Sequence, residues 1–300
     1  MTTKTRNRLL AIIIVAFPFV LFSFFLFSRV VEVPPRPPAL PNPNGYDNFL
    51  RAGSEVAENT GDFDTMNVAQ LRELAGKNAA ALAEARAGLS NQCLVPVQYT
   101  ESYASNHLND LAGMKRLAQA FTAEGMLVEM EGRTNDAIQS FVDTIRLGGE
   151  TMRGGVLIDG LVGIAIDAMG TAHLQTLVPH LNANTCRETE ATLESLEASS
   201  PTWNEVIQQE NDWSHATFRG WRYDLMRLES GKSASAAIAS SKRKFDAREQ
   251  KRQQLIIALA ARAYQLEKGH PPASAADLVP DYLKAVPKDP VTGTNLIYSP

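Results

Sequence analysis

The feature that most constrains this chain is an uncharged, strongly apolar segment near its beginning. Residues 9–27, LLAIIIVAFPFVLFSFFLF, form a run of nineteen residues without a charge. An α-helix needs about 20 apolar residues to cross the hydrocarbon core of a bilayer. The segment therefore predicts a transmembrane anchor over residues 9–28, preceded by a short tail of residues 1–8.

A cleaved secretory signal is the alternative interpretation of this segment, because the basic start MTTKTRNR is typical of a signal sequence. Such a signal has an apolar core of about 7 to 15 residues, followed by a cleavage site with small residues. The apolar run here is longer, and the residues SRVVE that follow it contain no suitable pair of small side chains. We therefore expect an uncleaved anchor.

Basic residues predict the orientation of the anchor. Lys4, Arg6 and Arg8 precede the apolar run, whereas Arg29 follows it. Cytoplasmic flanks of membrane helices are enriched in lysine and arginine. We therefore expect a single-pass protein of the bacterial cytoplasmic membrane, with a cytoplasmic amino terminus and an exported, periplasmic carboxy-terminal domain.

A proline-rich stretch follows the anchor. Residues 33–44, VPPRPPALPNPN, have six prolines in twelve positions. This density favours an extended polyproline II conformation and excludes a helix or a central strand. Residues 29–45 are therefore expected to form a linker between the bilayer and the exported domain.

Beyond the linker, the periodicity of the chain is helical. Apolar residues recur at spacings of three and four, and alternating β-branched runs are few. The predicted fold class is mainly α, with a helical exported domain over residues 46–252. The predicted helices cover residues 46–59, 65–89, 108–131, 134–148, 155–180, 186–198, 202–229 and 235–268.

Capping and proline signals support two of these helix boundaries. Thr185 and Glu188 have the spacing of a capping box, and Pro201 marks the start of a later helix.

Residues 156–181 are apolar enough to suggest a second membrane span. Asp159 and Asp167 lie inside that segment, and charge at mid-bilayer is expensive. We therefore expect a central helix of the bundle there.

Part of the body resembles a single tetratricopeptide repeat. The matching residues follow one another at spacings of 4, 3, 4, 5 and 4: Phe121, Gly125, Val128, Gly132, Ala137 and Phe141. The resemblance implies two antiparallel helices with a turn at Gly132, small residues where the helices approach, and Phe121 packed against Phe141. Glu124 and Thr144 depart from the family pattern, and no second copy follows. Tetratricopeptide-like helical packing is expected, without transferred binding residues.

The end of the chain resembles the carboxy-terminal part of type II secretion major pseudopilins. Over about 45 residues, the helix end, the Gly-x-x-Pro turn, the LVP helix and the PKDP turn occur in the family's order. The motif residues are Tyr264, Gly269, Pro272, Pro280, Pro287, Asp289 and Pro290. The resemblance implies a small α+β module over residues 253–300. The anchor lacks the prepilin-peptidase site and glutamate of that family, so a pilus subunit is not expected and no calcium ligand is transferred.

Side chains with catalytic or metal-binding potential show no recognisable motif. The histidines His173 and His180 lie seven residues apart without a third ligand, so packed or solvated roles are expected. Trp203, Trp213 and Trp221 fall close to one helical stripe and are expected in the core. Paired glycines at 148–149 and 154–155 are interpreted as helix punctuation. No metal or cofactor is predicted.

Cys93 and Cys186 are the only cysteines, and export would place them in an oxidising compartment. Their spacing fits no redox motif, and a disulfide between them is left open. The formal net charge of -4 gives no reason to expect nucleic-acid binding.

These features favour a membrane-anchored envelope protein that acts through protein–protein contacts, as a scaffold or adaptor. An envelope hydrolase acting on peptide or glycan is one alternative. A buried carboxylate pair, or a deep cleft lined by Trp203, Trp213 and His215, would support it. An accessory of a secretion or pilus-like system is the other alternative, and it depends on the tail resemblance alone.

Overall fold

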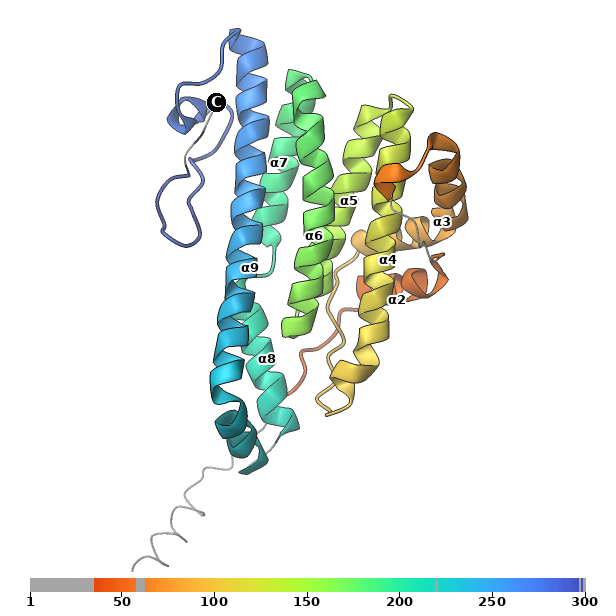
Figure 1. Cartoon of the computed structure of the whole chain (residues 1–300), viewed down its shortest axis with the longest axis vertical. Coiled ribbons are helices and arrows are strands. Elements are labelled where there is room, and N and C mark those ends of the chain that lie inside the picture. The colour runs from red at the N-terminus through yellow and green to blue at the C-terminus, as the bar shows by residue number, and fades with distance from the viewer. Residues whose placement is uncertain (1–34, 58–62, 219–220, 297, 299–300) are drawn as a thin grey trace, which may run out of the picture. The chain divides into compact units, whose positions relative to one another are not determined.

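The body of the chain consists of helices joined by short connections, as Figure 1 shows for the computed structural model. The structure describes residues 35–57, 63–218, 221–296 and 298, without the side chains of residues 64, 221–230 and 232. Residues from Pro37 to Pro300 form one unit. The predicted anchor, and the part of the predicted linker before residue 35, lie outside the described residues.

The mainly α prediction is confirmed. The α-helices of the described residues are α2 (Gly45–Glu55), α3 (Val68–Leu89), α4 (Tyr103–Met130), α5 (Thr134–Met152), α6 (Leu157–Leu177), α7 (Ala183–Ser199), α8 (Trp203–Thr217) and α9 (Trp221–Lys268). Short 3-10 turns are η1 (Phe63–Thr65), η2 (Val178–His180) and η3 (Ala275–Leu278). The predicted break between residues 229 and 235 is wrong, because α8 ends at Thr217 and α9 already begins at Trp221.

Side-chain caps explain where several helices begin. Asn67 and Gln70 form a capping box at the start of α3, and Thr202 and Glu205 form one at the start of α8. The capping box predicted from Thr185 and Glu188 is wrong. Asn182 caps α7 instead, because its Oδ1 accepts a hydrogen bond of 2.9 Å from the Thr185 backbone N–H.

Figure 1 shows helices α9, α6, α5 and α4 in succession across the unit, with α7 and α8 beside α9 and with α2 and α3 beyond α4. Two large apolar clusters fill the space between them. One joins parts of α3, α4, α5 and α6 to η2, α7, α9 and the tail, and the other joins α2, α3 and α4 to parts of α5, α6 and α8. The core is therefore distributed along the row of helices and is not gathered at one centre.

Glycines allow α5 and α6 to approach closely. A Cβ atom at Gly148 would lie 2.7 Å from the Gly163 carbonyl oxygen, and one at Gly170 would lie 2.5 Å from the Phe141 carbonyl oxygen. No other residue permits contact at that distance. The interpretation of Gly148 as helix punctuation is therefore wrong, whereas Gly154, at φ +69°, does make the turn after α5.

Helices α4 and α5 form the hairpin expected from the repeat-like segment. Gly132, at φ +79°, lies in the turn between them, and Val128 and Ala137 are buried on either side. The Phe141 ring lies over Gly125, where an added Cβ would meet it at 2.4 Å. The small residue at position 125 is therefore required by the aromatic ring opposite.

The expected packing of Phe141 against Phe121 is not what the structure shows. Phe141 stacks on His173 of α6, with 5.0 Å between ring centroids. Phe121 belongs to the other apolar cluster, where the Arg86 guanidinium lies 5.0 Å from its ring centroid. The difference arises because α6 packs along α5 and supplies the partner that a second repeat would otherwise supply.

The tail after α9 folds back along that helix. Gly269, at φ +82°, ends α9, and Tyr264 contacts the rings of His270 and Tyr282 at centroid distances of 5.6 and 5.3 Å. Pro272 is buried, whereas Pro280 is exposed. The Asp289 carboxylate accepts hydrogen bonds from the backbone N–H groups of residues 291 and 292, next to Pro290.

The α+β character predicted for this module is not seen in the described residues. The tail there has the 3-10 turn η3 and one isolated antiparallel bridge between Lys288 and Asn295. A bridge of one residue pair lacks the ladder of hydrogen bonds that makes a strand.

Of the described helices, one stretch is long and apolar enough to cross a membrane, Leu157–His180. It contains α6, whose Asp159 and Asp167 side chains are almost completely buried against other helices of the unit. Both carboxylates have cationic partners, which are described below. These contacts agree with the central bundle helix that the two aspartates predicted.

Gly125→Ala tests the close contact in the hairpin. We expect the free energy of unfolding in urea to fall by about 1 to 3 kcal/mol, because the added methyl group overlaps the Phe141 ring. Gly76→Ala is the matched control, since an added Cβ inside α3 meets nothing within 4 Å. That change should raise the free energy of unfolding by about 1 kcal/mol. Equal effects of the two changes would contradict the contact.

Candidate functional site

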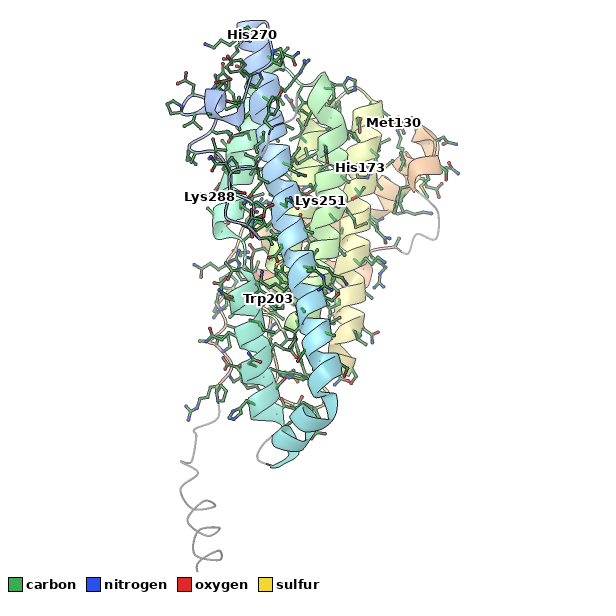
Figure 2. The ribbon with its side chains drawn as sticks, turned by 60° about the vertical axis from the view of Figure 1, so that its left-hand side comes forward. Met130, His173, Trp203, Lys251, His270 and Lys288 are labelled. Atoms are coloured by element: carbon green, nitrogen blue, oxygen red, sulfur yellow. The ribbon has the colours of Figure 1, made fainter. Side chains whose placement is uncertain are left out.

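A groove of about 480 Å³ lies where the α7–α8 turn, the middle of α9 and the tail meet. Figure 2 shows Trp203 at the start of α8 and Lys288 in the tail, both to the left of α9 in that view. Residues distant in sequence line the groove: Glu194, Glu197, Ala198, Ser200, Pro201, Thr202, Trp203, Phe245, Asp246, Arg248, Glu249, Gln253, Ile256, Lys284, Ala285, Val286 and Pro287.

The α7–α8 turn places an aromatic side chain in this groove. Helix α7 ends before Pro201, and the Thr202 capping box starts α8 at the next residue. Trp203 is thereby held against Phe245 of α9 in an edge-on contact, with 5.3 Å between ring centroids. The apolar part of the groove follows from this pair together with Ile256 and the tail.

A buried charge network lies under the groove. The Asp167 carboxylate of α6 accepts a hydrogen bond of 3.0 Å from Arg248 Nε and another from Arg252 Nη2. Arg248 also donates to Ser200 Oγ at 2.9 Å. Glu197 Oε2 lies 3.8 Å from Arg252 Nη1. The network therefore contains two guanidinium groups and two carboxyl groups.

Burial shifts the proton affinities of this network. Burial lowers the pKa of Arg252, although the nearby Asp167 acts in the opposite direction. Burial raises the pKa of Glu197, although Arg248 and Arg252 act in the opposite direction. A buried pair of opposite charges is costly to break, because the remaining charge has no water around it. The network is therefore a rigid support for the groove.

Most charged groups at the rim are already paired. Lys284 Nζ lies 2.6 Å from Glu194 Oε2, and Lys242 Nζ lies 2.8 Å from Asp246 Oδ2. Glu249, by contrast, accepts a hydrogen bond of 3.2 Å from the neutral side chain of Gln253. The groove therefore combines an apolar wall with a rim of excess negative charge.

A carboxyl pair adjoins the groove on α7. Glu190 is buried one helical turn before Glu194, which also contacts Lys284 of the tail. Burial, followed by the charge of Glu194, raises the pKa of Glu190 to about 7. The Glu190 carboxyl group therefore holds its proton to higher pH than an exposed glutamate does. Glu190 itself does not line the groove.

A second buried polar cluster surrounds His107 of α4. Its Nε2 lies 2.6 Å from Asp159 Oδ1, and its Nδ1 lies 3.1 Å from Asp110 Oδ2. A neutral imidazole can donate through one nitrogen only, so this arrangement requires the imidazolium. Burial alone would lower the pKa of His107, but the two aspartates together raise it. The Tyr103 ring stacks on the imidazole at 4.9 Å.

This cluster also holds the start of α6. Asp159 Oδ2 accepts a hydrogen bond of 2.7 Å from the Val156 backbone N–H, and Glu210 of α8 accepts one of 2.9 Å from the Leu157 N–H. Carboxylates are favourable at a helix amino terminus. His107 therefore compensates a carboxylate that is needed for the helix and has no exposure to water.

The structure separates the residues that sequence analysis considered together. Trp203 lines the groove, whereas Trp213 is buried elsewhere and donates its indole N–H to the Gln98 carbonyl oxygen at 3.1 Å. His215 does not line the groove, and the Trp221 side chain lies outside the described residues. The cleft of Trp203, Trp213 and His215 that would have supported the hydrolase alternative is therefore not formed, and the expected core position of Trp203 is only partly right.

The two cysteines do not form the candidate disulfide. Cys93 and Cys186 are both free and buried, and they belong to different apolar clusters. Burial raises the pKa of Cys93 to about 12 and the pKa of Cys186 to about 11. Both thiols are therefore packed groups with little thiolate at neutral pH.

His173 and His180 also lie in different surroundings. His173 stacks on Phe141, and His180 is exposed at the end of η2. In the described part of the chain, no group of three or more histidine, cysteine, aspartate or glutamate side chains is arranged to hold a metal ion.

Sequence reasoning missed the groove and both buried charge clusters. The available signal was the pair of aspartates in an apolar helix, which demands buried cationic partners. Their partners could not be chosen from the many arginines and the five histidines of the chain.

Comparisons with protein-family models, with curated proteins and with solved structures each found no significant match.

His107→Gln should lower the free energy of unfolding at pH 6 by about 3 to 5 kcal/mol, because Asp159 loses its buried cationic partner. The raised pKa of His107 also sets the sign of a pH effect. Its contribution is fully present below the unfolded pKa of 6.5 and is lost as the pH rises through the higher folded value. Urea unfolding at a series of pH values measures both effects. A variant with the pH slope of the unsubstituted protein would contradict the imidazolium.

Glu190→Gln should have the opposite effect. Because its folded pKa is about 7 against 4.5 when unfolded, Glu190 contributes stability at low pH that is lost between these values. The variant should therefore be more stable than the unsubstituted protein at pH 8, by about 1 kcal/mol, and no more stable at pH 4. Glu188→Gln, at an exposed position of the same helix, is the control and should change neither value.

Proposed function

We propose that this protein is anchored in the bacterial cytoplasmic membrane and that its exported helical domain acts through protein–protein contacts, as a scaffold or adaptor. The anchor and its orientation are supported by the uncharged run of residues 9–27 and its basic flank. The contact function is supported chiefly by one observation. The groove beside α9 combines an apolar wall with polar groups that are mostly committed to ion pairs within the chain.

Because these polar groups already form ion pairs within the chain, the groove is better suited to binding than to catalysis. A catalytic acid or base must be within hydrogen-bond reach of a substrate. Glu194 contacts Lys284, and the two arginines of the network contact Asp167. The groove side chains therefore hold the helices and tail together, and the apolar surface remains for a partner.

An envelope hydrolase remains the second candidate because of one observation, the buried Glu190 next to Glu194. Glu190 has the raised pKa that an acid catalyst needs at neutral pH. Glu190 has no face in the groove, and Trp213 lies elsewhere. We therefore rank this function below partner binding.

The resemblances of the sequence add detail to the proposal. The repeat-like hairpin of α4 and α5 is consistent with the role of tetratricopeptide-like domains in protein contacts. The pseudopilin-like tail supplies one wall of the groove through residues 284–287. It suggests a place as an accessory of a secretion or pilus-like system.

Reporter fusions test the proposed topology. A periplasm-active reporter fused after residue 60 should be active, and the full-length chain should remain in the membrane fraction. Moving Lys4, Arg6 and Arg8 to the other side of the apolar run should lower the reporter activity. A soluble product that lacks about 28 residues would show a cleaved signal instead.

Site-specific photo-crosslinking in intact cells tests the groove. A photoreactive amino acid at position 246 or 286 should give crosslinks to another protein, because both positions line the groove. The same amino acid at exposed positions 115 and 188 should give none of these products. Crosslinks that are equally strong at all four positions would contradict a specific docking site.

A further inference from the structure

We infer that the groove beside α9 binds an extended polypeptide segment that carries a lysine or arginine side chain. This inference depends on the proposed contact function and adds the chemistry of the partner. Three features of the groove support it: an open backbone along one wall, the Glu249 carboxylate with only a neutral partner, and a half-buried tryptophan.

The open backbone belongs to the tail. Residues 285 and 286 line the groove, and in the described part of the chain neither their N–H nor their C=O groups have a hydrogen-bond partner. The residues that follow are paired, since Leu296 N–H donates to the Pro287 carbonyl oxygen at 2.9 Å. Unpaired backbone next to a bridged segment is a place where an extended polypeptide can add through main-chain hydrogen bonds.

The unbalanced charge is negative. Four carboxyl side chains line the groove, against the cationic groups of Arg248 and Lys284. Arg248 is committed to Asp167 and Ser200, and Lys284 is committed to Glu194. Glu197 Oε2 is buried and lies 3.8 Å from Arg252 Nη1, whereas Glu249 contacts the neutral Gln253. A cationic side chain complements the Glu249 carboxyl group, and an anionic one is repelled.

Trp203 completes the site for such a side chain. It is half-buried against Phe245 and lines the groove together with Glu197 and Glu249. The indole face attracts lysine and arginine groups, and it packs against their aliphatic stems. The partner segment thus meets an apolar surface, a negative rim and open backbone groups at one place.

Fluorescence anisotropy with the detergent-solubilised full chain tests this inference. The probes are fluorescein-labelled Val-Lys-Val-Lys-Val-Lys, its glutamate counterpart, and the lysine peptide with alternate N-methylated backbone amides. We expect the lysine peptide to bind at least about tenfold more tightly than the glutamate peptide. The N-methylated peptide should bind more weakly than its parent, because it cannot donate those main-chain hydrogen bonds.

Variants assign the binding to the groove. Glu249→Gln should weaken binding of the lysine peptide about fivefold, and Trp203→Ala should weaken it about tenfold. Glu188→Gln is the matched control and should leave binding unchanged. It lies nine residues before Glu197 on the same helix, and this spacing places it on the opposite face. Glu249→Lys should shift the preference toward the glutamate peptide, a gain that misfolding cannot produce.

Two results would overturn the inference: equal binding of the lysine and glutamate peptides, or equal effects of Glu249→Gln and Glu188→Gln. Groove-specific crosslinks together with either result would leave the proposed contact function intact and remove only this partner chemistry. Absence of groove-specific crosslinks in cells, with peptide binding as expected, would instead count against the proposed function.

Discussion

The contact between Asp167 of α6 and the two arginines of α9 is the interaction on which the rest of the arrangement depends. A carboxylate inside an apolar helix is stable only if a cation reaches it. Arg248 and Arg252 lie one turn apart on α9, and both reach this carboxylate. Their side chains therefore fix α9 along α6, and Arg248 joins this contact to the α7–α8 turn through Ser200. The groove lies above that junction.

Glycine residues allow α5 to pack closely against α6 and so help to hold α6 in the bundle. Gly148 and Gly163 bring α5 and α6 together at backbone distance, and Gly125 admits the Phe141 ring between α4 and α5. The start of α6 is held by Asp159, which His107 compensates. Helix α6 is therefore bound by small residues along its length and by buried ion pairs at its start and at its middle. This explains how so apolar a helix belongs to the bundle.

The tail packs against α7 and α9 and forms one wall of the groove. Arg187 donates to both carboxylate oxygens of Glu267, and its guanidinium lies 4.1 Å from the Tyr282 ring centroid. Lys284 then contacts Glu194 of α7 and places residues 285–287 opposite Trp203. One wall of the groove thus comes from the end of the chain and the other from its middle.

The sequence by itself determined the helical character of the body and most helix boundaries, and its resemblance to a tetratricopeptide repeat predicted the turn at Gly132 and the buried position of Phe141. These features depend on local periodicity and backbone freedom, which neighbouring residues decide. Only the tertiary structure decided that Asp167 meets Arg248 and Arg252, that Phe141 stacks on His173, and that residues near 200, 245 and 285 form one groove. Such contacts join residues far apart in the chain. Because many arginines and aromatic residues satisfy the same local pattern, only packing selects among them.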